Sequence, residues 1–97
     1  MQLWIALCEV NVGPDVLESG RTLAFTNVVV WGTSSEDALA NIRNCFAEYK
    51  WTLVGCEQID PFDHEKDYGE SLNDQVERAA DNPNAVIYGT FHTYKPN

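Results

Sequence analysis

Residues 32–50, GTSSEDALANIRNCFAEYK, form the stretch that decides the fold. Ser34 stands where a helix begins, because its hydroxyl can accept a hydrogen bond from a first-turn amide and Asp37 follows three residues later. Apolar side chains then recur at helical spacing: Ala38, Leu39, Ile42, Cys45, Phe46 and Tyr49. This spacing puts them on one face of a helix, so the pattern predicts a helix over residues 35–49 that packs against a sheet.

Strand-forming segments flank this helix. Residues 3–12 and 23–31 are rich in β-branched and aromatic residues, and the turn signal Gly13-Pro14 lies between them, which predicts a hairpin with a long loop. Residues 51–59 predict a third strand. A strand, a helix and a strand in succession favour a right-handed crossover, so we expect the second and third strands to be parallel neighbours.

The last third of the chain repeats the alternation of helix and strand. Ser71 and Asp74 have the capping spacing again, and a thinner apolar stripe follows, which predicts a helix over residues 70–81. Residues 85–94 predict the last strand, so the order is ββαβαβ. We therefore predict one α+β domain over residues 1–97, a two-layer sandwich of a mixed four-stranded sheet with two helices on one face.

The composition indicates a compact, folded chain. Of its 97 residues 44% are hydrophobic and 11% aromatic, which excludes the signature of intrinsic disorder. Six Lys and Arg against 15 Asp and Glu give a net charge of −9, which argues against a nucleic-acid-binding surface. The N-terminal apolar run has no basic stretch before it and stops at Glu9, too early for a signal peptide or a membrane span. We expect a cytoplasmic protein that contacts neither nucleic acid nor membrane.

The strands do not alternate between apolar and polar residues, as the strands of a sheet with one wet face would. We therefore expect something to cover the second face of the sheet. The first expectation is a second copy of the chain, since two-fold homodimers are the commonest oligomers. The loops over residues 13–22 and 60–70 are the second possible cover, and an aromatic ligand groove is the third reading. The residues assigned to this dimer or ligand face are Phe25, Trp31, Tyr88, Phe91 and His92, with Trp4 and Trp51 as further groove residues.

An acidic stretch runs over residues 57–81, where nine acidic and two basic residues give a net charge of −7. Such a block is typical of a solvated face that aids solubility, and it is also what a docking surface for a basic protein requires. We assign that docking surface to Asp63, Glu65, Asp67 and Glu70. The spacing resembles a calcium loop only poorly, because Tyr68 and Asp74 stand where Gly and Glu are needed, so no metal site is predicted.

Three cysteines, Cys8, Cys45 and Cys56, each fall inside an apolar pattern. Their number is odd and they lack the C-x-x-C spacing, so the sequence predicts neither a disulfide framework nor a zinc site. We expect reduced thiols that fill the core.

The two histidines have no partner at a recognised spacing. His64 lies among carboxylates and is expected to be solvated. His92 shares a predicted strand with Tyr88, and the two could support acid–base chemistry with Glu9 or Glu57 if the strands were neighbours. No cofactor-binding motif occurs, so we predict no cofactor.

These patterns favour a small, acidic, non-enzymatic protein of the cytoplasm. We expect it to be homodimeric through its sheet and to bind another macromolecule, as an inhibitor or an antitoxin-like regulator does. The alternative is a small-molecule-binding protein or minor enzyme that uses the aromatic groove. The two readings differ in whether the second face of the sheet is sealed or hollow.

Overall fold

A computed structural model describes residues 1–13, 17, 22–63, 65–82, 85–89 and 91–93. The elements are β1 (Gln2–Asn11), β2 (Leu23–Gly32), α1 (Ser35–Glu48), β3 (Thr52–Pro61), α2 (Glu70–Ala80), β4 (Val86–Tyr88) and β5 (His92–Thr93). The predicted order ββαβαβ is confirmed, with the last predicted strand divided into β4 and β5, which both pair with β2.

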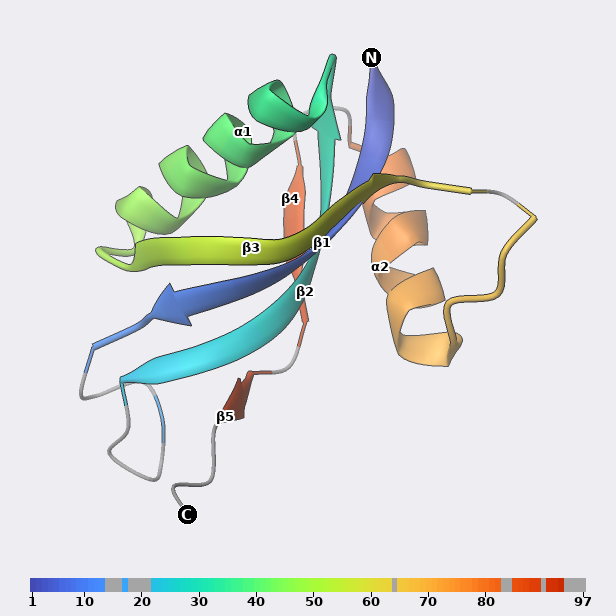
Figure 1. Cartoon of the computed structure of the whole chain (residues 1–97). Coiled ribbons are helices and arrows are strands. Elements are labelled where there is room, and N and C mark those ends of the chain that lie inside the picture. The colour runs from blue at the N-terminus through green and yellow to red at the C-terminus, as the bar shows by residue number, and fades with distance from the viewer. Residues whose placement is uncertain (14–16, 18–21, 64, 83–84, 90, 94–97) are drawn as a thin grey trace.

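The sheet has the order β3-β1-β2-β4, and every pairing in it is antiparallel. The prediction of a mixed sheet is therefore wrong. Strands β2 and β3 do run in the same direction, since both are antiparallel to β1, but β1 lies between them. One edge of β2 is already taken by β1 and the other by β4 and β5, so the chain leaving α1 pairs with the remaining edge of β1 (Figure 1).

The two helices lie on opposite faces of the sheet, so the predicted two-layer sandwich is wrong (Figure 1). Alternate residues of β1 point to the two sides: Ala6, Cys8 and Val10 face α1, whereas Leu3 and Ile5 face α2. The lack of apolar–polar alternation in the strands has this cause, because a helix covers each face. At the end of the sheet where β1 begins, the cover on the second face is a segment of the same chain, α2.

Helix α1 forms as its sequence predicts. The Ser34 hydroxyl oxygen accepts a hydrogen bond from the amide of Asp37 at 3.1 Å, and the helix buries Ala38, Ile42 and Phe46 against the sheet. The turn into the helix needs a glycine, because a Cβ at Gly32 would lie 2.8 Å from the Ala38 amide nitrogen. The short connection between β2 and α1 thus fixes the helix close to the sheet.

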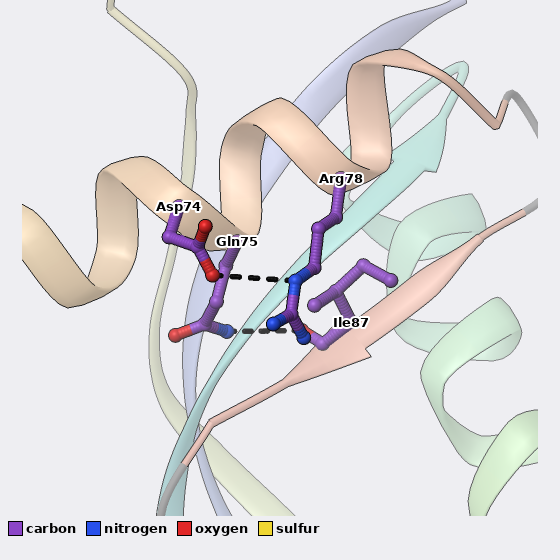
Figure 2. A network of polar contacts seen from close by, with 4 residues as sticks. All are labelled: Asp74, Gln75, Arg78 and Ile87. Atoms are coloured by element: carbon purple, nitrogen blue, oxygen red, sulfur yellow. Dashed lines mark hydrogen bonds and ion pairs between the residues drawn. The ribbon is translucent and has the colours of Figure 1, made fainter.

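Helix α2 is held by polar groups as well as by apolar packing. The Trp31 indole N–H donates to the carbonyl oxygens of Ala79 at 2.8 Å and Asn82 at 3.1 Å, at the end of the helix. The buried Gln75 amide nitrogen donates to the carbonyl oxygens of Asn27 and Ile87, each at 3.2 Å (Figure 2 shows the second bond). The helix begins after Gly69 rather than at a Ser71 cap, and no side chain caps it.

Candidate functional site

The five residues predicted to share one apolar face lie on both sides of the sheet. Trp31 packs with the α2-side cluster, whereas Tyr88 and Phe91 pack with the α1-side cluster. Phe25 and His92 are cross-strand partners in the pairing of β2 with β5. The structure therefore brings together Tyr88 with Phe91 and Phe25 with His92, but it does not bring the five onto one surface.

Aromatic rings gather where α1 ends and β3 begins. Trp51 contacts Phe46, Tyr88 and Phe91 edge-on, with ring centroids 5.4–5.7 Å apart, and it stacks on Tyr49 at 4.7 Å. Burial, and then the neighbouring Tyr49, raise the pKa of the Tyr88 hydroxyl. The rings pack against one another and against the α1-side core, with Phe46 fully buried and Tyr49 52% exposed.

Cavities lined by described residues lie elsewhere, including one on each side of the sheet. A cavity of about 440 Å³ opens beside α1 and β4, and Trp31, Asn41 and Cys45 are among its lining residues. A second, of about 560 Å³, lies between α2, β1 and β3 and is lined in part by Gln58 and Tyr68. Of the five residues predicted for a ligand face, only Trp31 lines either of these two cavities. Both linings mix polar and apolar groups.

The predicted acid–base site does not assemble. His92 is the partner of Phe25, and Phe25 is the partner of Glu9, so the three follow one another across three strands. Tyr88 is paired with Val28, whose side chain belongs to the α1-side core. Cross-strand partners share a face, so Tyr88 lies on the face of Val28 and His92 on the face of Phe25. Phe25 and Val28 are three residues apart on β2 and point to opposite faces, so Tyr88 and His92 lie on opposite faces of the sheet. The second histidine, His64, lies outside the described residues.

The exposed carboxylates of the acidic stretch stand on the loop after β3 and on α2. We call this the acidic surface; its exposed members are Asp63, Glu65, Asp67, Glu70, Asp74 and Glu77. Four of them line a shallow depression at the start of α2: Asp67, Glu70, Asp74 and Glu77. Of the four predicted acidic residues, Asp67 and Glu70 line this depression, and Asp74 and Glu77 of α2 extend the set.

Hydrogen bonds link the described residues of the loop on either side of position 64 and at its end. The Asp63 carboxylate accepts from the amide of Glu65 at 3.0 Å, and the Asp67 carboxylate accepts from the amide of Gly69 at 2.9 Å. These are turns in which an aspartate side chain holds the backbone two residues on. The Gly69 amide, and then the Asn73 side chain, lower the pKa of Asp67. The rings of Phe62 and Tyr68, 5.5 Å apart, anchor the loop at its base.

Both basic residues of the acidic stretch are engaged locally. Arg78 makes an ion pair with Asp74, one turn earlier on α2, at 3.2 Å (Figure 2). Lys66 places its ammonium group 5.8 Å from the centre of the Tyr68 ring, within the range of a cation–π contact. The negative charge of the remaining carboxylates is thus presented outward.

A second group of reactive side chains lies inside the sheet. Cys8 of β1 and Cys56 of β3 are cross-strand partners, and their sulfur atoms are 3.0 Å apart. Both are thiols, as is Cys45 on α1. Cys8 is fully buried, whereas Cys56 is partly exposed.

The environment makes the two paired thiols unequal. The hydrogen bond with Cys8 lowers the pKa of Cys56; burial opposes this shift, and the positive charge of Arg43 adds to it. The same hydrogen bond and burial raise the pKa of Cys8. Cys45 stands apart, with a pKa raised by burial and then by Glu48. One thiol of the pair is therefore disposed to ionise and the other to remain protonated.

Comparison with protein-family models, with curated proteins and with solved structures finds no match to this chain. Within the described part of the chain, no group of three or more His, Cys, Asp or Glu side chains could hold a metal ion. No helix in that same part is long and apolar enough to cross a membrane.

Sequence reasoning missed the pairing of Cys8 with Cys56. The two residues are 48 positions apart, and the predicted topology put the third strand beside the second rather than beside the first. Both cysteines do lie within predicted strands, and that is the one signal the sequence carries for the pairing. It becomes informative only when the order of the strands is known.

Proposed function

We propose that this chain is a non-enzymatic binding protein of the cytoplasm whose acidic surface docks a basic protein, as an inhibitor or antitoxin-like regulator does. One observation carries the proposal. The exposed carboxylates stand on a loop held by its own hydrogen bonds and on a helix anchored to the sheet, while the two bases among them are engaged.

The electrostatic argument concerns recognition and rate of encounter. A surface of one sign attracts a partner of the opposite sign over a distance of about 8–10 Å at physiological salt and excludes partners of like charge. In the loop part of the acidic surface, the Asp63 and Asp67 carboxylates already accept hydrogen bonds from the backbone amides of Glu65 and Gly69. A fixed surface loses less conformational entropy on binding than a flexible one. A merely solvating acidic segment has no need of such order.

We further propose that two copies associate through the part of the sheet that α2 leaves bare. Strands β1 and β2 each have ten residues and span about 33 Å, whereas the 11 residues of α2 span about 16 Å. Figure 1 shows α2 beside the end of the sheet where β1 begins. The α2-facing positions beyond it include the apolar Leu23 and Phe25 with their polar partners Asn11 and Glu9, and Leu23 is 38% exposed. These apolar side chains support a two-fold contact.

The alternative of an aromatic ligand groove has less support. Tyr88, Phe91 and Trp51 pack against one another and against Phe46 rather than around an open space. The geometry accordingly favours the binding protein over the small-molecule-binding protein or minor enzyme.

Charge reversal at matched sites tests the proposal. Asp63 and Asp67 shape the loop, so Glu65→Lys with Glu70→Lys is the cleaner variant of the acidic surface. Glu36→Lys with Glu48→Lys on α1 changes the net charge equally on the other side of the sheet. A cytoplasmic basic protein retained by the wild type and the α1 variant, but not by the acidic-surface variant, supports the proposal. Equal retention by all three proteins, or a partner that is not basic, contradicts it.

A further inference from the structure

Cys8 and Cys56 are placed as a disulfide would need them. They are direct partners in the antiparallel pairing of β1 with β3, where Cα atoms lie about 4.5–5.5 Å apart, inside the range that disulfides span. Their sulfur atoms are 3.0 Å apart, so bond formation requires an approach of about 1 Å. Side-chain rotation with a small backbone adjustment supplies a movement of this size.

The backbone around the pair is suited to such an adjustment. The register of β1 against β3 shifts between Leu7 and Cys8, and again between Glu9 and Val10. These shifts leave Glu57 and Val54 of β3 without a partner in the pairing. Bulges of this kind interrupt the regular ladder and are found where a side chain is redirected. Here one lies next to the Cys8–Cys56 pair and the other lies on its far side, beyond the Glu9–Gly55 pair.

Access to the two sulfur atoms differs. Cys8 is 0% exposed, beneath α1, and packs with Ile42 and Phe46. Cys56 is partly exposed on β3, which is the edge strand of the sheet, and the positive charge of Arg43 acts on it. A thiol that attacks a disulfide must be reachable and must ionise, and a positive neighbour favours the thiolate. The thiol that closes the internal bond needs only to touch the first sulfur.

We propose that Cys8 and Cys56 form a dithiol site that reacts with low-molecular-weight disulfides, with Cys56 as the attacking thiol and Cys8 as the resolving thiol. This inference goes beyond the binding function proposed above and does not depend on it. In the first step the Cys56 thiolate forms a bond to one sulfur of the small disulfide, whose own bond breaks, and a small thiolate leaves. In the second step the Cys8 sulfur bonds to the Cys56 sulfur, and the bond between Cys56 and the small molecule breaks. The second small thiol leaves and takes up the proton of Cys8. The two cysteines are oxidised to a disulfide, and the small disulfide is reduced to two thiols.

The test uses the reduced full chain and oxidised glutathione as the probe. After reaction, remaining thiols are blocked with N-ethylmaleimide under denaturing conditions, and the protein is digested with trypsin and analysed by mass spectrometry. Cleavage after Arg21, Arg43, Lys50 and Lys66 puts the three cysteines into separate peptides. We expect residues 1–21 to be joined to residues 51–66, in a chain of monomer mass, with Cys45 alone blocked.

Variants that each lack one of the three cysteines assign the two roles. Cys8→Ala should retain one glutathione on Cys56, because the resolving thiol is gone. Cys56→Ala should gain no glutathione on Cys8 while folded, because that thiol is buried. Cys45→Ala is the matched control and should form the internal disulfide like the wild type.

Three blocked thiols in the wild type, or a glutathione adduct that persists on Cys56 with Cys8 present, overturns the proposal. A linkage that involves Cys45 overturns it as well. These readouts come from the wild type, so the proposal stays testable even if a variant folds poorly.

Discussion

The indole N–H of Trp31 donates to the carbonyl oxygen of Ala79 at 2.8 Å and thereby ties the end of β2 to the last turn of α2. The carbonyl groups at a helix C-terminus lack partners within the helix and need donors from elsewhere. A side chain predicted to face a second copy or a ligand instead attaches a helix of its own chain.

Trp31→Phe keeps most of the ring packing and removes this donor. We expect the free energy of unfolding to fall by about 1 kcal/mol, as is typical for the loss of a hydrogen bond. Hydrogen exchange should show faster opening of α2 than of α1, because only α2 loses an attachment. Urea unfolding of the same samples measures the change in global stability. Equal loss of protection from hydrogen exchange in both helices contradicts this role for Trp31.

Gly89 and Gln75 should show coupled effects on stability. A Cβ at Gly89 would lie 2.7 Å from the Gln75 side-chain oxygen, so in Gly89→Ala the Gln75 amide must shift and its hydrogen bonds to Asn27 and Ile87 are strained. We expect a destabilisation of about 1 kcal/mol, the size of one weakened hydrogen bond. In a Gln75→Ala background the same change should cost less, with a coupling energy of about 1 kcal/mol in a double-mutant cycle. Gly55→Ala is the control, because nothing lies within 4 Å of a Cβ there. Additive effects of the two changes contradict the contact.

The shape of the acidic loop should depend on pH through Asp67. Its pKa is lowered from the ordinary value of 3.8, first by the Gly69 amide and then by Asn73, so the charged form stabilises the folded state. That contribution is present above 3.8 and is lost as the pH falls through the lower folded value. We expect Asp67→Asn to lower the melting temperature near pH 7 and to match the wild type in strong acid. A difference that stays constant over this range excludes a role for the charge.

The helix over residues 35–49 could be predicted because its capping residues and its apolar stripe are local features of the sequence. The order of the strands could not, since a strand's own residues do not state which neighbour takes its second edge. The face chosen by α2 depends on distant partners, the Trp31 indole and the carbonyl oxygens that accept from Gln75. These contacts exist only after the sheet has formed.

The candidate sites likewise divide into features that are local in the sequence and contacts between distant residues. The acidic surface could be predicted as a concentration of charge, because its members are close in sequence. The turns made by Asp63 and Asp67, and the engagement of Lys66 by Tyr68, needed the three-dimensional structure. The pairing of Cys8 with Cys56 follows from strand order and register alone.

Oxidation of the cysteine pair should stabilise the fold. The bond would join two residues 48 positions apart, and disulfides that close loops of this size typically stabilise by about 2–4 kcal/mol. For a domain of this length that corresponds to a rise in melting temperature of roughly 10–20 °C. Calorimetry of the protein with and without oxidised glutathione measures the shift. Cys45→Ala should show the same rise and Cys56→Ala none; a rise that persists in Cys56→Ala has another cause.

The half of the sheet beyond α2 should determine the assembly state. Leu23 is an exposed apolar side chain on that half, so Leu23→Arg would place a charge in the proposed two-fold contact, opposite its own copy or close to it. We expect the wild type to sediment as a dimer at tens of micromolar and the variant as a monomer. Tyr49→Arg is the matched control, because Tyr49 is 52% exposed and lies in the aromatic cluster on the α1 side. A dimer lost in Tyr49→Arg but kept in Leu23→Arg would move the contact to the α1 side. A wild type that sediments as a monomer would remove the dimer from the proposal and leave the acidic surface as a site on a single chain.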